Sequence, residues 1–192
     1  MKIAVGSDHR GFHSKQRLKS FLVEQGHEVT DCGADSDASS DYPDYAIPAC
    51  LLVACQKVDR GILMCGSGIG MTMTANKVAG IRAALCHDEL TAEMSRRHNN
   101  ANVLCLAADL LGDELIHRMV QVWLATPFDA GRHARRVQKV MDAEKYLSPR
   151  AEEVPARCAP AKPRPKKEAK EAPAGRGRST SADSPDSPSS PR

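Results

Sequence analysis

The strongest constraint on the fold of this chain is its alternation between short strand-like runs and longer amphipathic segments. The expected strands lie at Lys2–Gly6, His27–Asp31, Gly61–Cys65, Ile81–Cys86 and Val103–Ala107. Segments with apolar side chains at helical spacing separate them. Because parallel strands need crossover connections, which are usually helical, this alternation predicts an α/β fold with a five-stranded parallel sheet.

The segments between the strands predict six helices. Leu18, Phe21 and Leu22 show the i, i+3, i+4 spacing of a helix that Gly26 ends. The expected helices are Gly11–Gln25, Tyr45–Gln56, Met71–Val78, Asp88–Asn99, a segment from Leu111 to Val122, and His133–Tyr146. With right-handed crossovers, the pattern favours a flavodoxin-like (Rossmann-type) three-layer sandwich with strand order 2-1-3-4-5.

The apolar pattern ends at Leu147. Residues 148–192 contain nine of the twelve prolines, no Leu, Ile, Met or aromatic residue, and a single Val. Such a segment cannot bury enough surface to offset its ordering entropy, so we expect one domain at 1–147 and a disordered tail at 148–192. The tail holds ten Lys and Arg against six Asp and Glu, whereas residues 1–147 hold 17 against 18. The domain therefore lacks a nucleic-acid footprint, and only weak polyanion contact by the tail is conceivable.

The cysteines indicate the compartment. There are seven, and they are Cys32, Cys50, Cys55, Cys65, Cys86, Cys105 and Cys158. An odd number without a C-x-x-C pair is typical of reduced thiols in a cytoplasmic protein. The chain enters its first strand directly and has no apolar run of transmembrane length, so we expect neither a signal peptide nor membrane contact.

Polar residues follow the first and third expected strands, which are neighbours in the sheet. Asp8 and His9 come after the first, and the run Cys65-Gly66-Ser67-Gly68-Ile69-Gly70 ends the third. The two segments should face each other across one crevice, where ligands of such folds bind. A glycine turn before a helix favours an anion, and a thiol there ionises readily. A tight connection and a packed thiol are the plainer alternatives.

Two further segments carry groups suited to a polar substrate. His98 and Asn99 open a run of polar side chains that exceeds what a helix C-cap needs. Arg132 and Arg136 share a helix face and could clamp a phosphate, although a solvated basic stripe has the same pattern. No metal is expected, because His9 and His13 lack a third ligand. A thiol base, an acid histidine, an anion hole and a phosphate site suit proton abstraction beside the carbonyl of a phosphorylated sugar.

Seven blocks of the sequence resemble the ribose-5-phosphate isomerase B family, which includes allose-6-phosphate and galactose-6-phosphate isomerases. The blocks are Gly6–Gly11, Asp41–Ala46, Cys65–Gly70, Ala75–Lys77, Gly80–Arg82, Arg97–Asn100 and Gly131–Arg136. They run in order through about residues 1–147, and the tail has no counterpart. The resemblance implies a homodimer with the active site at its interface, and it leaves tetramers open.

The same resemblance implies interconversion of ribose 5-phosphate and ribulose 5-phosphate through an enediolate, in the non-oxidative pentose phosphate pathway, without cofactor. It makes Cys65 the base and His98 the acid–base that opens the sugar ring. It assigns substrate binding to Asp8, His9, Tyr42, Gly66, Ser67, Gly68, Ile69, Gly70, Asn99, Arg132 and Arg136. Which of these residues come from the partner subunit stays open.

Asp109 departs from the family pattern, which often has Arg at this place after the fifth strand. An acidic residue there would repel phosphate, so either Asp109 points away or the anion site relies on His9, Arg132 and Arg136. A six-carbon phosphosugar isomerase stays a rival reading. A non-catalytic nucleotide-binding module is a second rival, but it would leave Cys65 and His98 unexplained.

Overall fold

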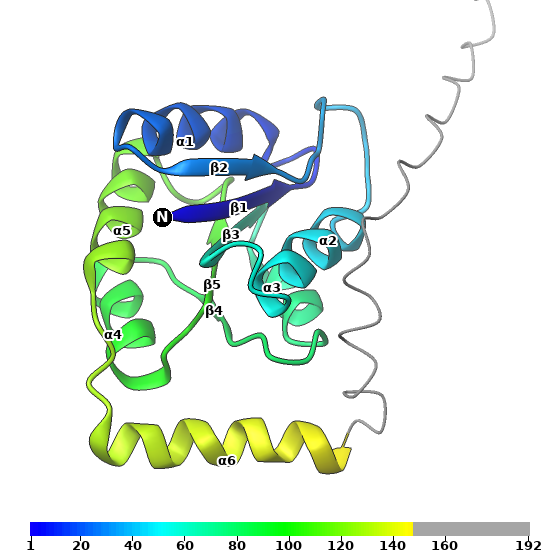
Figure 1. The fold of residues 1–192 in the computed structure, drawn as a ribbon. Helices are drawn as coiled ribbons and strands as arrows, with labels where there is room; N and C mark the ends of the chain where they lie inside the picture. The colour runs from blue at the N-terminus through cyan, green and yellow to red at the C-terminus, as the bar shows by residue number, and fades with distance from the viewer. Residues whose placement is uncertain (148–192) are drawn as a thin grey trace, which may run out of the picture. The chain divides into compact units, whose positions relative to one another are not determined.

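The computed structural model describes residues 1–147, and the tail expected at 148–192 lies outside them. The described part is an all-parallel five-stranded sheet with helices on both faces (Figure 1), which confirms the predicted α/β class. The strands are β1 (Lys2–Ser7), β2 (Glu28–Asp31), β3 (Arg60–Cys65), β4 (Ala83–Leu85) and β5 (Val103–Ala107). The helices are α1 (Phe12–Glu24), α2 (Pro43–Ala54), α3 (Ile69–Ala75), α4 (Glu89–Asn99), α5 (Asp113–Ala125) and α6 (Gly131–Leu147).

The strand order is β2-β1-β3-β5-β4, so the predicted order 2-1-3-4-5 is wrong at one edge. β5 pairs with β3 from Gly61↔Val103 to Cys65↔Ala107, and β4 pairs only with β5. All five residues of β5 are buried, whereas the three residues of β4 are half-buried. A central strand must be covered on both faces, and the short β4 suits the sheet edge.

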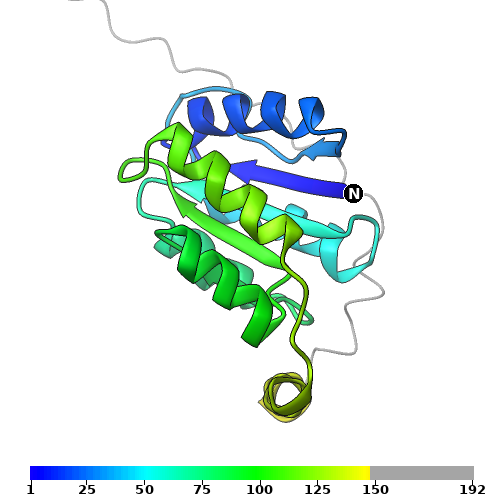
Figure 2. The same ribbon diagram turned by 90° about the vertical axis from the view of Figure 1, so that its left-hand side faces the viewer.

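The helices form two layers that follow from this order. α1, α5 and α4 cover one face, which Figure 2 presents to the viewer, and α2 and α3 cover the other (Figure 1). Because β4 leads back toward the sheet centre, a right-handed crossover sends α4 to the α1 side. α6 lies beside the β4 edge and contacts α4.

Alternate strand residues build a core on each side of the sheet. Ile3 and Val5 of β1 face the α1 and α5 side, where they join a buried cluster that contains Trp123. Ala4 lies between them in sequence and joins the opposite cluster, which contains Met71 of α3. The sheet is thus a rigid platform whose carboxyl edge positions the polar segments after β1 and β3.

The cysteines differ in part from expectation. Five are free thiols, and they are Cys32, Cys50, Cys65, Cys86 and Cys105. Cys55 is disulfide-bonded, so the expectation of reduced thiols is wrong for this residue. Cys55 lies half-buried at the end of α2, whereas Cys50 in the same helix is buried, and burial raises the pKa of Cys50 to about 12. Cys158 lies outside the described residues.

Candidate active site

The segments that follow β1 and β3 meet at the carboxyl edge of the sheet, as predicted. The two strands pair from Ile3↔Arg60 to Ser7↔Met64. The backbone N–H of Asp8 donates to the carbonyl oxygen of Met64 at 3.2 Å. A Cβ on Gly11 would lie 2.9 Å from that same carbonyl oxygen, so only glycine lets α1 begin against the end of β3. We call Asp8, His9, Tyr42 and Cys65–Gly70 the Cys65 cluster.

Cys65 is the last residue of β3, and its side chain is buried. The backbone N–H of Gly68 donates to its Sγ at 3.2 Å. Gly68 has a φ of +74°, and a Cβ there would lie 2.5 Å from Leu85, so this position requires glycine. The Gly68 amide therefore serves Cys65 in this structure, while the Ile69 amide donates to Ser67 Oγ at 3.3 Å.

Asp8 and His9 each have one polar atom engaged by the backbone. Asp8 Oδ1 accepts from the N–H groups of Arg10 at 2.9 Å and Gly11 at 3.1 Å, which turns the chain into α1. His9 Nδ1 lies 3.1 Å from the carbonyl oxygen of Ser40 and 3.2 Å from its nitrogen. Within residues 1–147 these hydrogen bonds do not engage Asp8 Oδ2 or His9 Nε2.

Two side chains border the glycine loop. The Tyr42 ring lies against Gly70, where a Cβ would come within 2.8 Å of Tyr42 Cζ. Asp109 directs Oδ2 toward Gly66, where a Cβ would come within 2.5 Å of it, so this carboxylate does not point away from the loop. Arg10 binds the same Oδ2 through Nε at 3.0 Å and Nη2 at 2.6 Å. The ion pair neutralises the charge that would otherwise repel a phosphate here.

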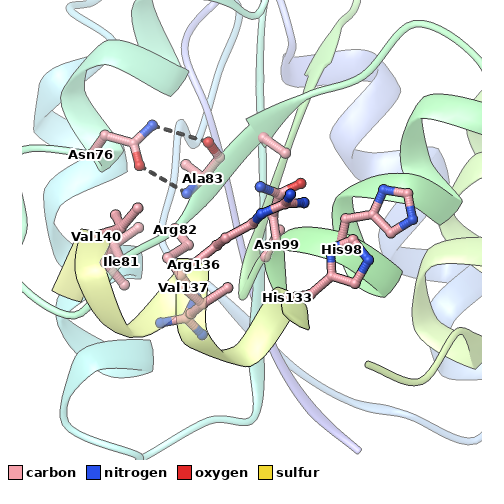
Figure 3. A pocket seen from close by; sticks show the side chains of 12 residues that line it. Asn76, Ile81, Arg82, Ala83, His98, Asn99, His133, Arg136, Val137 and Val140 are labelled. Atoms are coloured by element: carbon pink, nitrogen blue, oxygen red, sulfur yellow. Dashed lines mark hydrogen bonds between the residues drawn. The ribbon is translucent and has the colours of Figure 1, made fainter. Parts of the chain in front are cut away.

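The remaining predicted residues gather around a second site, a cavity of about 570 Å³ between α4, β4 and α6. We call it the His98 pocket (Figure 3). Its lining residues are Asn76, Ile81, Arg82, Ala83, Ala84, His98, Asn99, Ala101, His133, Arg136, Val137 and Val140. The volume lies in the range of small-ligand sites, and the polar groups stand beside an apolar wall of α6 side chains.

Four of the polar groups belong to the last turn of α4 and the start of α6. His98 and Asn99 end α4, and His133 and Arg136 line the pocket from α6. Arg132 is not a lining residue, and its Nε lies 3.4 Å from Nε2 of the buried His133. The predicted arginine pair is thus unequal in this structure, with one guanidinium at the cavity and one beside it.

Sequence reasoning missed three polar residues of the pocket. His133 stacks on His98, with ring centroids 4.2 Å apart. Arg82 donates from Nε and Nη2 to the carbonyl oxygen of Asn100 at 3.0 and 2.8 Å, which caps the end of α4. Asn76 bonds both backbone groups of Ala83 and so holds the edge strand. All three lie in the sequence blocks that resemble the isomerase family, and no other sequence feature indicated that they belong to a site.

Comparison with known proteins decides the family. Residues 3–140 match the model of the Ribose/Galactose Isomerase family. The chain belongs to this family. Ribose-5-phosphate isomerase B of Escherichia coli (strain K12) is 45% identical over 143 residues, covering 74% of this chain and 96% of that protein.

Solved structures of the Ribose/Galactose Isomerase family share the fold. Ribose-5-phosphate isomerase B of Clostridium thermocellum has a TM-score of 0.76 and 44% identity, covering 77% of this chain and all of that chain. The Mycoplasma genitalium enzyme with bound ribulose 5-phosphate has a TM-score of 0.73 and 40% identity, covering 75% and 96% of the two chains. Among residues 1–147 no cluster of three His, Cys, Asp or Glu could hold a metal, and no helix suits a bilayer crossing.

The Cys65 cluster and the His98 pocket lie far apart within one chain. Cys65 lies at the carboxyl end of β3, opposite Ala107, the last residue of β5. α4 runs back along the sheet, so His98 at its end precedes Val103, the first residue of β5 (Figure 2). Five strand residues span about 16 Å, so Cys65 and His98 lie toward opposite ends of the sheet. A single chain does not unite the predicted acid and base.

Proposed function

We propose that this protein is an aldose–ketose isomerase that interconverts ribose 5-phosphate and ribulose 5-phosphate. The observation that carries the proposal is the solved relative with bound ribulose 5-phosphate, at 40% identity over nearly its whole length. A buried thiol that accepts an amide hydrogen bond, beside free carboxylate and imidazole atoms, supplies the base chemistry that this reaction needs.

In the proposed reaction, the Cys65 thiolate removes the C2 proton of the open-chain aldose. The electron pair forms the C1–C2 double bond of an enediolate, whose negative charge resides on oxygen. A proton passes from the C2 hydroxyl to the C1 oxygen, and the thiol returns its proton to C1, so that C2 becomes the carbonyl carbon of the ketose. Backbone N–H groups of residues 66–70 other than those of Gly68 and Ile69, which bond Cys65 and Ser67, stabilise the enediolate oxygens. Each such donor contributes about 3 kcal/mol at comparable sites. The proposal invokes no metal or cofactor.

The other residues bind and open the sugar in this proposal. Asp8 Oδ2 and His9 Nε2 bind the sugar phosphate, and Tyr42 covers it. His98 moves the proton that opens the furanose ring, because an imidazole gains and loses a proton near neutral pH. The remaining substrate contacts are Asn99 and the phosphate-binding Arg132 and Arg136.

We further propose that the working site is composite and belongs to a homodimer. The Cys65 cluster of one copy would meet the His98 pocket of the other, since one chain keeps them apart. Exposed apolar residues near the Cys65 cluster support such an interface, and they are Tyr42, Ile47, Ile69 and Met73. Two-fold symmetry would then create two identical sites.

Subunit complementation tests the composite site. Cys65→Ser and His98→Gln should each fail to turn over ribose 5-phosphate when assayed alone. A mixed dimer has one doubly altered site and one fully wild-type site, so unfolding and refolding an equal mixture should restore about a quarter of wild-type activity. Absence of activity in a mixture shown by mass spectrometry to contain mixed dimers contradicts the proposal.

Assays on ribose 5-phosphate and allose 6-phosphate test the reaction itself. We expect higher kcat/KM for the pentose phosphate, because the relatives matched here carry that name. A preference for the hexose phosphate would favour the six-carbon phosphosugar isomerase. A protein that isomerises neither sugar phosphate but binds nucleotides would favour the non-catalytic nucleotide-binding module.

We also propose that the protein is located in the cytoplasm, where sugar phosphates are metabolised. We further propose that the folded domain ends near residue 147.

A further inference from the structure

The proposed ring-opening residue, His98, has a partner that the proposed mechanism does not use. Its imidazole lies parallel to that of His133, with centroids 4.2 Å apart and the ring planes at 1° (Figure 3). His98 comes from the last turn of α4, and His133 comes from the first turn of α6. Rings stacked this closely restrict each other's rotation, so the contact fixes the direction in which the His98 ring faces.

His133 is itself held firmly. Its side chain is 8% exposed, and its backbone N–H donates to the carbonyl oxygen of Ala130 at 3.0 Å. The segment before α6 is tied to α4 at the neighbouring residue, because Arg97 Nε donates to both carboxylate oxygens of Asp129 at 3.1 and 3.2 Å. The N–H of Asp129 also donates to the carbonyl oxygen of Arg97 at 3.0 Å. The start of α6, which carries His133, is therefore held against α4 by these hydrogen bonds.

The surroundings keep His133 neutral. Arg132 Nε points its hydrogen at His133 Nε2, 3.4 Å away, so Nε2 carries a lone pair and the ring proton sits on Nδ1. Burial lowers the pKa of His133, and the adjacent His98, Arg132 and Arg136 lower it further, against a smaller opposing effect of Asp129. A neutral ring can lie against His98 in either protonation state of His98 without charge repulsion.

We propose that His133 is a positioning residue that holds the His98 imidazole in one orientation toward the sugar and leaves proton exchange to His98 alone. The inference rests on the proposed ring-opening role of His98. Proton transfer needs the imidazole nitrogen within hydrogen-bond reach of the ring oxygen, and a misplacement of about 1 Å can cost about a hundredfold in rate. His133 acts through His98 and need not touch the substrate.

Two substitutions separate stacking from polar contact. His133→Phe keeps a flat ring against His98, and His133→Ala removes it. His117→Phe is the matched control, because His117 stacks on Phe21 at the same 4.2 Å on α5, away from both sites. The readouts are kcat and KM for ribose 5-phosphate, and deuterium uptake from heavy water into ribulose 5-phosphate, a ketose that needs no furanose opening.

We expect His133→Ala to lower kcat on ribose 5-phosphate about tenfold or more, with KM changed less than about threefold. Its deuterium exchange from ribulose 5-phosphate should stay near wild type. His133→Phe should recover most of kcat, and His117→Phe should match wild type. The ring-current shift of the His98 Cε1 proton in NMR spectra should persist in His133→Phe and vanish in His133→Ala.

Three results overturn the inference. One is a kcat of His133→Ala within about twofold of wild type. The second is a His133→Phe variant as impaired as His133→Ala with a raised KM, which would mean that His133 binds substrate. The third is an equal fall of deuterium exchange and net isomerisation. His98→Gln distinguishes the failures: if it keeps wild-type kcat, the ring-opening role fails, whereas an inactive His98→Gln beside an active His133→Ala rejects only the positioning role.

Discussion

At the scale of single residues, the proposed chemistry depends on how Cys65 is held. Its sulfur is buried at a strand end and accepts the Gly68 amide, whose left-handed backbone only glycine adopts without strain. We predict that Cys65→Ser folds normally but loses at least about a hundredfold in kcat, because a hydroxyl does not ionise near neutral pH. Cys32→Ser, which changes a thiol that is not part of the Cys65 cluster, should stay near wild type. Turnover of Cys65→Ser within a few-fold of wild type would exclude Cys65 as the base.

A second residue-scale feature concerns stability. Lys15 is 1% exposed, and its Nζ donates to Asp31 Oδ1 at 2.5 Å and to the carbonyl oxygen of Ala34 at 2.8 Å. Burial alone would raise the pKa of Asp31, but hydrogen bonds from Lys15, the Gly33 amide and Lys19 outweigh it and keep the pKa below 3.8. The pair joins α1 to the end of β2.

Removing one partner of this pair should be costly. We predict that Asp31→Asn lowers the free energy of unfolding by about 3–5 kcal/mol at pH 7, because Lys15 stays buried without its counter-charge. Lys19→Gln, which removes a more exposed partner of Asp31, should cost at most about 1 kcal/mol. Because folding lowers the pKa of Asp31, its contribution is complete above pH 3.8 and is lost as the pH falls through the folded pKa. Urea titrations should show that the difference in free energy of unfolding between wild type and Asp31→Asn becomes smaller below pH 3.8. A difference that stays constant with pH would contradict this account.

At the scale of elements, α6 presents its arginines unequally. Arg136 lines the His98 pocket, whereas Arg132 lies beside His133. We predict that both Arg→Ala variants raise KM for ribose 5-phosphate, with Arg136→Ala raising it about tenfold to a hundredfold and Arg132→Ala less, since a charged hydrogen bond is worth about 1.5–3 kcal/mol. Arg135→Ala, an exposed neighbour that does not line the pocket, is the control. Unchanged kcat/KM in both variants would contradict the proposed role of α6 in phosphate binding.

At the scale of the whole molecule, residues 1–147 contain two complete core layers and both candidate sites. We predict that ending the chain after Leu147 leaves the melting temperature within a few degrees and preserves kcat/KM, because residues 148–192 have almost no apolar side chains to bury. Differential scanning calorimetry and limited proteolysis check this, with a stable fragment expected near residue 148. A fall in Tm of more than a few degrees would mean that the tail packs on the domain.

The sequence by itself determined the layered α/β class, the adjacency of β1 and β3, and the chemical character of each site segment. These properties are local, because periodicity selects each element and a glycine turn follows from a few neighbouring residues. Only the tertiary structure decided that β5 separates β3 from β4, that Asp109 turns toward Gly66, and that His98 lies far from Cys65. Strand order depends on which runs can be covered on both faces, and the partners of His98 and Asp109 come from segments distant in sequence. Such contacts arise from packing of the whole chain, which no local pattern encodes.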